Sequence, residues 1–469
     1  MLPVRASPAA SISPVMESIL SRAPRMATAH RGCIGAFPTC INHGSDTPMN
    51  DMTQTPEMLI AMLGARARKA GAILAQATDE QKAQALKLAA QALRDAAPAI
   101  AAANARDMEN AAANGLSPAM LDRLRLDAGR ISATADGVDQ VATLPNPLGA
   151  IIDSSERPNG LVLQRVRVPL GVIGIIYESR PNVTADAAAL CLRAGNAVIL
   201  RGGSEAVESN RAIHAAMLSG IVAAGLPADV VQIVPTTDRA AVGALLKASE
   251  FIDLIIPRGG KSLVARVQEE ARVPVLAHLD GINHSYVHAA ADPDMACALV
   301  VNAKMRRTGV CGATETVLID RNFAAADRLV KALLDAKCAV RGDGDVQALD
   351  PRVTPAADDD WDTEYLDAIV SVRMVDGPDD AIAHIAAHGS HHTDAIITED
   401  AATAEQFLNA VDSAIVMWNA STQFADGGEF GLGAEIGIST GRLHARGPVA
   451  LEGLTTYKWL VRGTGQTRP

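Results

Sequence analysis

The chain has 469 residues, of which 48% are hydrophobic and 20% charged. This composition excludes a disordered or low-complexity protein, and the length suggests two or three domains of about 150 residues each. The net charge of −11 and the 3% aromatic content argue against a nucleic-acid binder, which needs basic patches and stacking platforms. No apolar run approaches the roughly 18 residues of a membrane span. The six cysteines are dispersed without C-x-x-C spacing, which favours free thiols in a reducing cytoplasm.

Residues 1–51 differ from the remainder of the chain. They are rich in Ser, Pro, Ala and Met, and they carry four arginines against one acid, Glu17, before Asp46. This pattern weakly resembles a transit peptide. A disordered extension, or a start codon assigned too early, is the simpler interpretation, and we leave this segment out of the predicted fold.

Residues 57–145 are predicted to be mainly helical, with a capping box at Thr78–Gln81. Residues 149–168 are β-like, with a turn at Pro158–Gly160. From there, short apolar runs alternate with helical segments. The runs are 171–177, 197–200, 230–234, 251–256 and 273–277, and the helical segments are 183–193, 205–224, 238–248 and 261–270. This alternation predicts βαβ units and a parallel sheet.

Three turns after these predicted strands carry glycine and arginine: 178–182 (ESRPN), 201–204 (RGGS) and 257–261 (PRGGK). The carboxyl ends of parallel strands share one edge of a sheet, and ligands bind there. Glycine allows close backbone approach, while arginine and helix N-termini favour phosphate groups. The three turns together predict a nucleotide site.

The second half mixes both element types again. We expect helices near 323–336, 378–387 and 402–411, strands near 367–374 and 394–398, and an acidic loop at 342–360. The alternating stretch 455–462 is predicted to be a strand that could pair with another subunit.

Cys311 is the candidate nucleophile. It follows Lys304, Arg306 and Arg307 and lies between Val310 and Gly312. A thiol attacks only as the thiolate, and nearby cations lower its pKa. Small neighbours leave the sulfur approachable and the backbone N–H groups free to stabilise an oxyanion. A buried, inert cysteine is the competing interpretation, and it is the one we apply to the other five.

Several segments carry a specific resemblance. VPLGVIGIIYESRPNVTADAAALCLRAGNAVILRGGSEA (168–206), FIDLIIPRGGKSLV (251–264), HLDGINHSYV (278–287), RRTGVCGATET (306–316), FGLGAEIGIST (430–440) and HARGPVALEGLTTYKWLVRG (444–463) resemble the γ-glutamyl phosphate reductases. That family, also called glutamate-5-semialdehyde dehydrogenase, lies within the aldehyde dehydrogenase superfamily. The resemblance covers about 55–469.

The resemblance implies an aldehyde dehydrogenase-like α/β fold. A Rossmann-like NADPH-binding domain would span 52–148 and 171–302, and an α/β catalytic domain 303–440. Residues 149–170 and 441–469 would form a β-hairpin oligomerisation element, so the chain is expected to be a homo-oligomer. The implied reaction is NADPH-dependent reduction of L-glutamyl 5-phosphate to L-glutamate 5-semialdehyde in proline biosynthesis, with glutamate 5-kinase as a possible partner.

In the implied mechanism, Cys311 attacks the acyl phosphate, phosphate departs, and hydride reduces the resulting thioester. Asn182 matches the oxyanion asparagine of the superfamily. Asp280 matches the place where hydrolysing relatives carry a glutamate base, and a reductase that expels phosphate needs no such base.

The resemblance also implies binding residues. Arg201 replaces the usual lysine, and Ser204 replaces the acid of NAD-preferring relatives, which favours NADPH. The expected cofactor residues are Arg201, Gly203, Ser204, Gly259, Gly260 and Glu364. The expected substrate residues are Arg180, Arg306 and Arg307 for anionic groups, Asp280 or Glu315 for the ammonium group, and His392 lining the cleft.

Alternatives remain open. His384 and His388 have the spacing of a metal pair but lack the Glu of an H-E-x-x-H motif, so we expect no metal. A related reductase could use another acyl phosphate or a CoA thioester. An inactive scaffold for the kinase is a third possibility, against which the intact Cys311 and glycine turns argue.

Overall fold

The computed structural model describes residues 55–468. The predicted extension, 1–51, lies outside them. The described chain begins with five helices: α1 (Pro56–Leu74), α2 (Asp79–Asp95), α3 (Ala97–Ala113), α4 (Pro118–Leu124) and α5 (Ala128–Thr143). Thr78 starts α2 because its side chain accepts a hydrogen bond from the Gln81 N–H, as predicted. The reciprocal half of the capping box is absent, because the Gln81 side chain donates to the Ala224 carbonyl instead. None of the helices in this range is long and apolar enough to cross a membrane.

A four-stranded parallel sheet follows, in the order β5 (Val231–Ile233), β4 (Ala197–Gly202), β3 (Val172–Tyr177) and β6 (Leu254–Arg258). Its crossover helices are α6 (Val183–Arg193), α7 (Val207–Ala223), α8 (Arg239–Lys247) and α9 (Lys261–Glu270). All six residues of β3 are buried, as expected for an apolar run covered by helices on both faces. The alternation predicted from the sequence is therefore confirmed for these elements.

The strand predicted at 273–277 is wrong. Pro274 has no N–H to donate, and only a single bridge, Ile255 to Val275, links this segment to the sheet. The Ile255 N–H donates to the Pro274 carbonyl.

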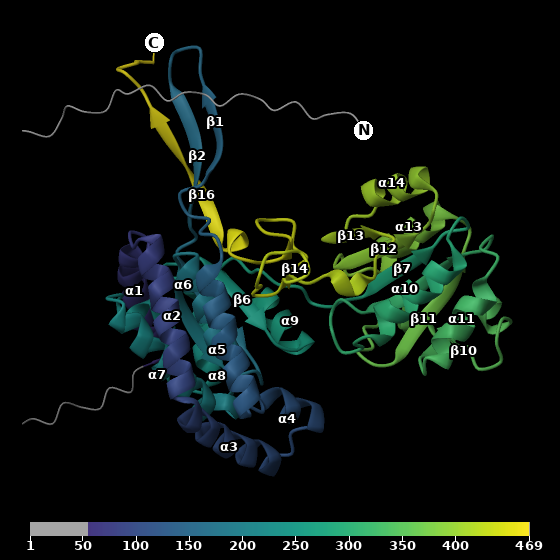
Figure 1. The fold of residues 1–469 in the computed structure, drawn as a ribbon, viewed down its shortest axis with the longest axis horizontal. Helices are drawn as coiled ribbons and strands as arrows, with labels where there is room; N and C mark the ends of the chain where they lie inside the picture. The colour runs from purple at the N-terminus through teal and green to yellow at the C-terminus, as the bar shows by residue number, and fades with distance from the viewer. Residues whose placement is uncertain (1–54, 469) are drawn as a thin grey trace, which may run out of the picture. The chain divides into compact units, whose positions relative to one another are not determined.

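A seven-stranded parallel sheet carries the second half of the chain. Its order is β10 (Thr354–Pro355), β9 (Ala339–Gly342), β11 (Ile369–Val375), β8 (Thr314–Asp320), β7 (Asn283–Val287), β12 (Thr393–Ile397) and β13 (Ile415–Trp418). Its helices are α10 (Pro293–Met305), α11 (Ala326–Asp335), α12 (Gly344–Gln347), α13 (Pro378–His388) and α14 (Ala401–Ala410) (Figure 1). Because β7 pairs with both β8 and β12, this sheet begins at residue 283, and the boundary expected at 302/303 is corrected to an earlier position.

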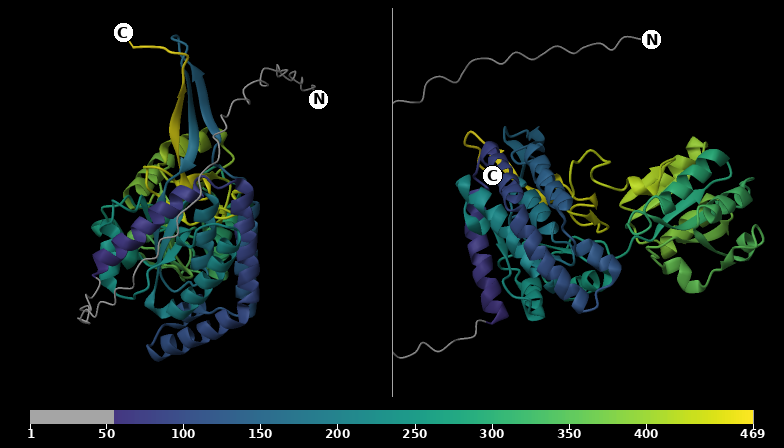
Figure 2. Two further views of the ribbon diagram at one scale, coloured as in Figure 1. Left: turned by 90° about the vertical axis from the view of Figure 1, so that its left-hand side faces the viewer. Right: turned by 60° about the horizontal axis from the view of Figure 1, so that its bottom comes forward.

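A separate three-stranded antiparallel sheet contains β1 (Ile151–Glu156), β2 (Val162–Pro169) and β16 (Thr455–Arg462). Figures 1 and 2 show the three strands side by side. The hairpin and the C-terminal strand, predicted as one element, thus pair within the chain.

Short elements complete the described chain: β14 (Ile438–Ser439), β15 (Gly447–Pro448), and five 3₁₀ turns, η1 (Ser204–Ala206), η2 (Ala228–Val230), η3 (Asp358–Asp362), η4 (Thr422–Phe424) and η5 (Glu452–Leu454). β14 pairs with β15. The segment around this pair supplies Ile436, Val449, Leu451 and Leu454 to the hydrophobic core of the first sheet.

Candidate active site

A cavity of about 1140 Å³ lies at the carboxyl ends of the first sheet. The turns after β3, β4 and β6 contribute Arg180, Ser204, Gly259 and Gly260, and the loop between α10 and β8 contributes Cys311. All strands of the first sheet are parallel, so their carboxyl ends meet at this edge. The turns that the sequence singled out are therefore brought together with the candidate nucleophile.

Two glutamates link the three turns. Glu178 Oε2 accepts from the Gly260 N–H at 3.1 Å, and a Cβ at Gly259 would lie only 2.5 Å from the same oxygen. Glu205 Oε1 accepts from the N–H and the hydroxyl of Ser179 at 2.5 and 2.9 Å. A side chain at position 259 would therefore displace the Glu178 carboxylate from this contact. Sequence reasoning did not identify either carboxylate as part of the site.

Arg201 is the second-last residue of β4 and does not line this cavity. Its terminal nitrogens donate to the carbonyls of Gly202 (2.6 Å) and Thr237 (2.8 Å), and its Nε has no hydrogen-bond partner. Burial lowers the pKa of its guanidinium. Gly203 lines a small separate groove together with Arg211 and Thr237.

Cys311 is partly buried and lines the cavity. Its carbonyl accepts from Asn283 Nδ2 at 2.6 Å. Burial raises the pKa of its thiol to about 11; Glu364 raises it further, and Arg258 opposes the shift. Arg258, in the 257–261 turn, and Arg180 are therefore cations that act on this sulfur.

The three cations before Cys311 have other roles. Lys304 is fully buried and pairs with Glu315 at 2.5 Å, so the expectation that it lowers the thiol pKa is corrected. Arg306 and Arg307 line the cavity. Arg306 donates to Gln423 Oε1 at 3.2 Å.

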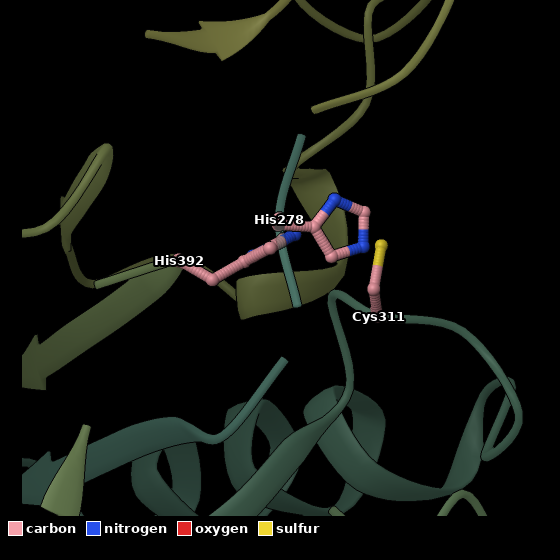
Figure 3. Close-up of side chains that lie close together, drawn as sticks. All are labelled: His278, Cys311 and His392. Atoms are coloured by element: carbon pink, nitrogen blue, oxygen red, sulfur yellow. The ribbon is translucent and has the colours of Figure 1, made fainter. Parts of the chain in front are cut away.

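Two histidines stand beside the thiol (Figure 3). Ligand atoms of His278, Cys311 and His392 all lie within 4.8 Å of one another. The two imidazole rings meet edge to face, with centroids 5.0 Å apart. His392 is fully buried, and this burial lowers its pKa to about 3. His392 was expected near the site, whereas His278 was missed; it is the first residue of the HLDGINH motif, two positions before Asp280.

Asp280 and Glu315 are each paired with a lysine. Asp280 forms an ion pair with Lys261 at 2.9 Å. Glu315 is buried against Lys304, with a pKa raised to about 7 by burial. The Glu315 side chain has no solvent-exposed area that a ligand could contact. The expectation that it binds an ammonium group is therefore corrected.

Asn182 starts α6, and Glu364 lies in the loop after η3. The Asn182 amide donates to Asp186 Oδ2 at 2.8 Å, and no hydrogen bond from this amide to Cys311 is present among the described residues. Glu364 lines the cavity, accepts from the Gly281 N–H at 3.0 Å, and has a pKa raised by burial.

The cavity wall also contains acids that the sequence analysis did not predict. Asp426, Glu429 and Glu435 line it. Glu435 is half-buried, accepts from the Gly427 N–H at 3.0 Å, and has a pKa raised by burial, with Arg258 opposing. Together with Arg180, Arg306 and Arg307, these acids give the cavity groups of both charges.

Comparison with known proteins gives consistent results. Residues 37–360 match the model of the aldehyde dehydrogenase family. The gamma-glutamyl phosphate reductase of Sphingopyxis alaskensis is 72% identical over 411 residues, which cover 88% of this chain and 96% of that protein. The protein of the same name from Zymomonas mobilis is 62% identical, covering 88% and 97%. The crystal structure of the Thermotoga maritima gamma-glutamyl phosphate reductase superposes with a TM-score of 0.85 at 40% identity, covering 87% of this chain and all of that one.

Proposed function

Since the chain belongs to the aldehyde dehydrogenase family, and within it to the gamma-glutamyl phosphate reductases, we propose that it reduces L-glutamyl 5-phosphate to L-glutamate 5-semialdehyde with release of phosphate. This is a step of proline biosynthesis. The observation that carries the proposal is the position of Cys311 in one cavity with the three glycine-containing turns. A nucleophile placed there can reach a substrate and a dinucleotide together.

The covalent step belongs to Cys311. Its sulfur attacks the acyl carbon, the bond to phosphate breaks, and a thioester remains. The backbone N–H groups around Cys311 stabilise the oxyanion. We also propose that the Asn182 amide breaks its hydrogen bond to Asp186 and donates to the same oxyanion.

We assign NADPH as the reductant. The Gly259 and Gly260 turn at the start of α9, together with Ser204, offers close backbone approach and a helix N-terminus to the diphosphate. No acid stands at position 204 to repel a 2′-phosphate. Arg201 shapes the neighbouring groove by holding Gly202 and Thr237. The cofactor, when bound, supplies hydride to the thioester, and Glu364 holds its nicotinamide ribose.

The substrate groups find partners on the cavity wall. Arg180, Arg306 and Arg307 bind the phosphate and the α-carboxylate. For the α-ammonium group we propose Glu435, which lines the cavity close enough to Cys311 to raise its pKa. Asp280 orients Lys261 at the cofactor turn, since the two form an ion pair.

We further propose a cytoplasmic homo-oligomer. The described cysteines are all free thiols, as expected in a reducing compartment. Tyr457, Trp459 and Val461 alternate along β16 and are 47%, 54% and 58% exposed. An apolar face of this kind is typical of a subunit contact. Glutamate 5-kinase, which makes the labile acyl phosphate, is the proposed partner for substrate transfer.

The reverse reaction tests the function directly. Purified protein is supplied with glutamate semialdehyde and NADP⁺, and NADPH formation is followed with and without phosphate. We expect NADPH only when phosphate is present, and at least about a 10³-fold loss in Cys311→Ala because the nucleophile is removed. Formation of NADPH with coenzyme A in place of phosphate would instead support an acyl-CoA reductase. No turnover with either acceptor would favour the inactive scaffold.

A further inference from the structure

The ring of His278 faces the reacting sulfur. Figure 3 shows a ring nitrogen of His278 directed towards Cys311 Sγ, and the two residues offer atoms within 4.8 Å of each other. Base–thiol pairs are often this loose before substrate binds and tighten in the complex. Among the described residues, His278 and His392 are the two histidines at this thiol.

Hydrogen bonding determines which nitrogen of His278 is available. Its Nδ1 lies 2.9 Å from the Ile438 carbonyl oxygen. A carbonyl only accepts, so Nδ1 must carry the hydrogen and donate it. In the neutral ring, Nε2 then holds a lone pair. This is the tautomer required to accept a proton from Cys311.

The thiol needs such an acceptor. A pKa of about 11 leaves on the order of one molecule in 10⁴ as thiolate at pH 7, since each pKa unit is a factor of ten. Burial lowers the pKa of His278, so its ring is neutral under the same conditions. The charged groups that face His278 are Arg258 and Asp280. Those that face Cys311 are Arg180, Arg258, Glu364 and Glu435.

We propose that His278 is the general base of this site, accepting the Cys311 proton at Nε2 as the sulfur attacks. The role in turnover rests on the function proposed above. As the S–C bond forms, the proton passes from Sγ to Nε2. The bond between carbon and phosphate oxygen then breaks, its electron pair leaves with phosphate, and Nε2 returns the proton to that oxygen. After reduction, departure of the aldehyde leaves a Cys311 thiolate, which takes one proton from solvent.

His392 acts as a positioning residue for this base. Its buried ring packs against the ring of His278 at 79°, and its Nδ1 bonds to the Thr393 hydroxyl at 2.9 Å. Burial lowers the pKa of His392, so its ring is uncharged and donates no proton to His278. The ring of His278 is thereby held between the Ile438 carbonyl and His392.

Alkylation of Cys311 by iodoacetamide tests the base without requiring any substrate. The rate at residue 311 is followed by peptide mass spectrometry between pH 5.5 and 10, because other cysteines also react. A chelator is included, since two imidazoles and a thiol also bind Zn²⁺. For the wild type we expect a rate that is nearly constant from pH 7 to 8. For His278→Gln we expect at least about a tenfold lower rate at pH 7, and a rise with pH that follows the thiolate fraction.

Controls separate this role from structural damage. His388→Ala removes a histidine of α13 that bonds to Asp362 far along the chain from the thiol, and should alkylate like the wild type. Imidazole in the buffer should partly restore the rate in His278→Ala. If neither His278 variant folds, a normal solvent deuterium isotope effect on wild-type alkylation still reports proton transfer, and its absence contradicts the proposal.

Equal alkylation rates in the wild type and His278→Gln would overturn the proposal, whatever the variant does in turnover. Loss of reductase activity with unchanged alkylation would also overturn it. If alkylation depends on His278 but the protein does not act on glutamate semialdehyde and phosphate, the base assignment stands and the proposed function fails.

Discussion

Lys304 and Glu315 lie on either side of the Cys311 loop, and both side chains are fully buried. Lys304 is in the last turn of α10, and Glu315 is in the first residues of β8. Their ion pair closes the base of the loop that carries the nucleophile, and the Tyr365 ring covers Lys304 Nζ at 5.8 Å. The pair therefore shapes the site without contacting the cavity.

Breaking this pair should destabilise the protein strongly. We expect Lys304→Met to lower the free energy of unfolding by about 3–5 kcal/mol, because it leaves an unpaired carboxylate in the interior. The double variant Lys304→Met/Glu315→Leu should recover most of that loss. Denaturant unfolding measures both. A single variant as stable as the wild type would show that the pair does not hold the loop.

Asp186 gives a prediction about pH. Burial raises its pKa to about 6, while its bond from Asn182 opposes the shift. A folded-state pKa above the unfolded value of about 3.9 means that the contribution to stability is present below pH 4 and lost as the pH rises to 6. The wild type should therefore lose up to about 3 kcal/mol relative to Asp186→Asn across this range, at about 1.4 kcal/mol per pKa unit. Urea unfolding at pH 4, 5, 6 and 7 tests this, and parallel curves for the two proteins would contradict it.

At the scale of elements, the sequence predicted most of the two parallel sheets. Buried parallel strands are continuous apolar runs, and residues 171–177 form one. The segment 273–277 is also apolar but forms no strand, because Pro274 lacks the N–H that would donate to the neighbouring strand.

The site was harder to predict. Local spacing placed Lys304 beside the thiol, but helix α10 turns that side chain towards Glu315, a contact visible only once β8 is packed against the helix.

The pair His278 and Asp280 illustrates the same limit. Both belong to one short motif, and spacing alone could not decide which side chain faces the nucleophile. The structure directs Asp280 to Lys261 at the start of α9. It directs His278 to Cys311. The deciding contacts come from Lys261, 19 residues before Asp280, and from Ile438, 160 residues after His278.

The β16 strand gives a prediction about assembly. Tyr457 and Trp459 stack with Arg165 of β2, whose guanidinium carbon lies 5.0 and 5.7 Å from the ring centroids. If this face is the subunit contact, Val461→Asp should lower the oligomer mass measured by light scattering, because a charge would be buried at the contact. Lys458→Asp, on the opposite face of the same strand, is the matched control. An unchanged mass in Val461→Asp would place the contact elsewhere.

At the scale of the whole molecule, the described residues that line the cavity are spread from Asp107 to Ile438. The Sphingopyxis alaskensis relative matches 88% of this chain while 96% of its own length is covered. About one-eighth of this chain therefore lies outside the match.

Residues 54–469 form one compact unit that contains the cavity lining, so a chain that starts at Gln54 should retain its turnover and its melting temperature. The phosphate-dependent assay and thermal unfolding test this, with the full chain as control. Loss of activity in the shortened chain would assign residues 1–53 a role in the enzyme. Mass spectrometry of the native N-terminus would show whether they are removed in the cell.

The first sheet's core contains side chains from both ends of the described chain. Leu74 and Leu86 pack in the same cluster as Val449, Leu451 and Leu454, and Asn196 Nδ2 donates to the Leu454 carbonyl at 2.8 Å. During synthesis, the core of the first sheet can therefore be completed only when almost the last residues have left the ribosome. The seven-stranded sheet, from residue 283 to 418, is contiguous in sequence and is free to form first. A chain stalled on the ribosome before residue 449 would lack Val449, Leu451 and Leu454 from the core of the first sheet, whereas the seven-stranded sheet would be complete. We therefore expect chaperones to bind the part of the chain that forms the first sheet.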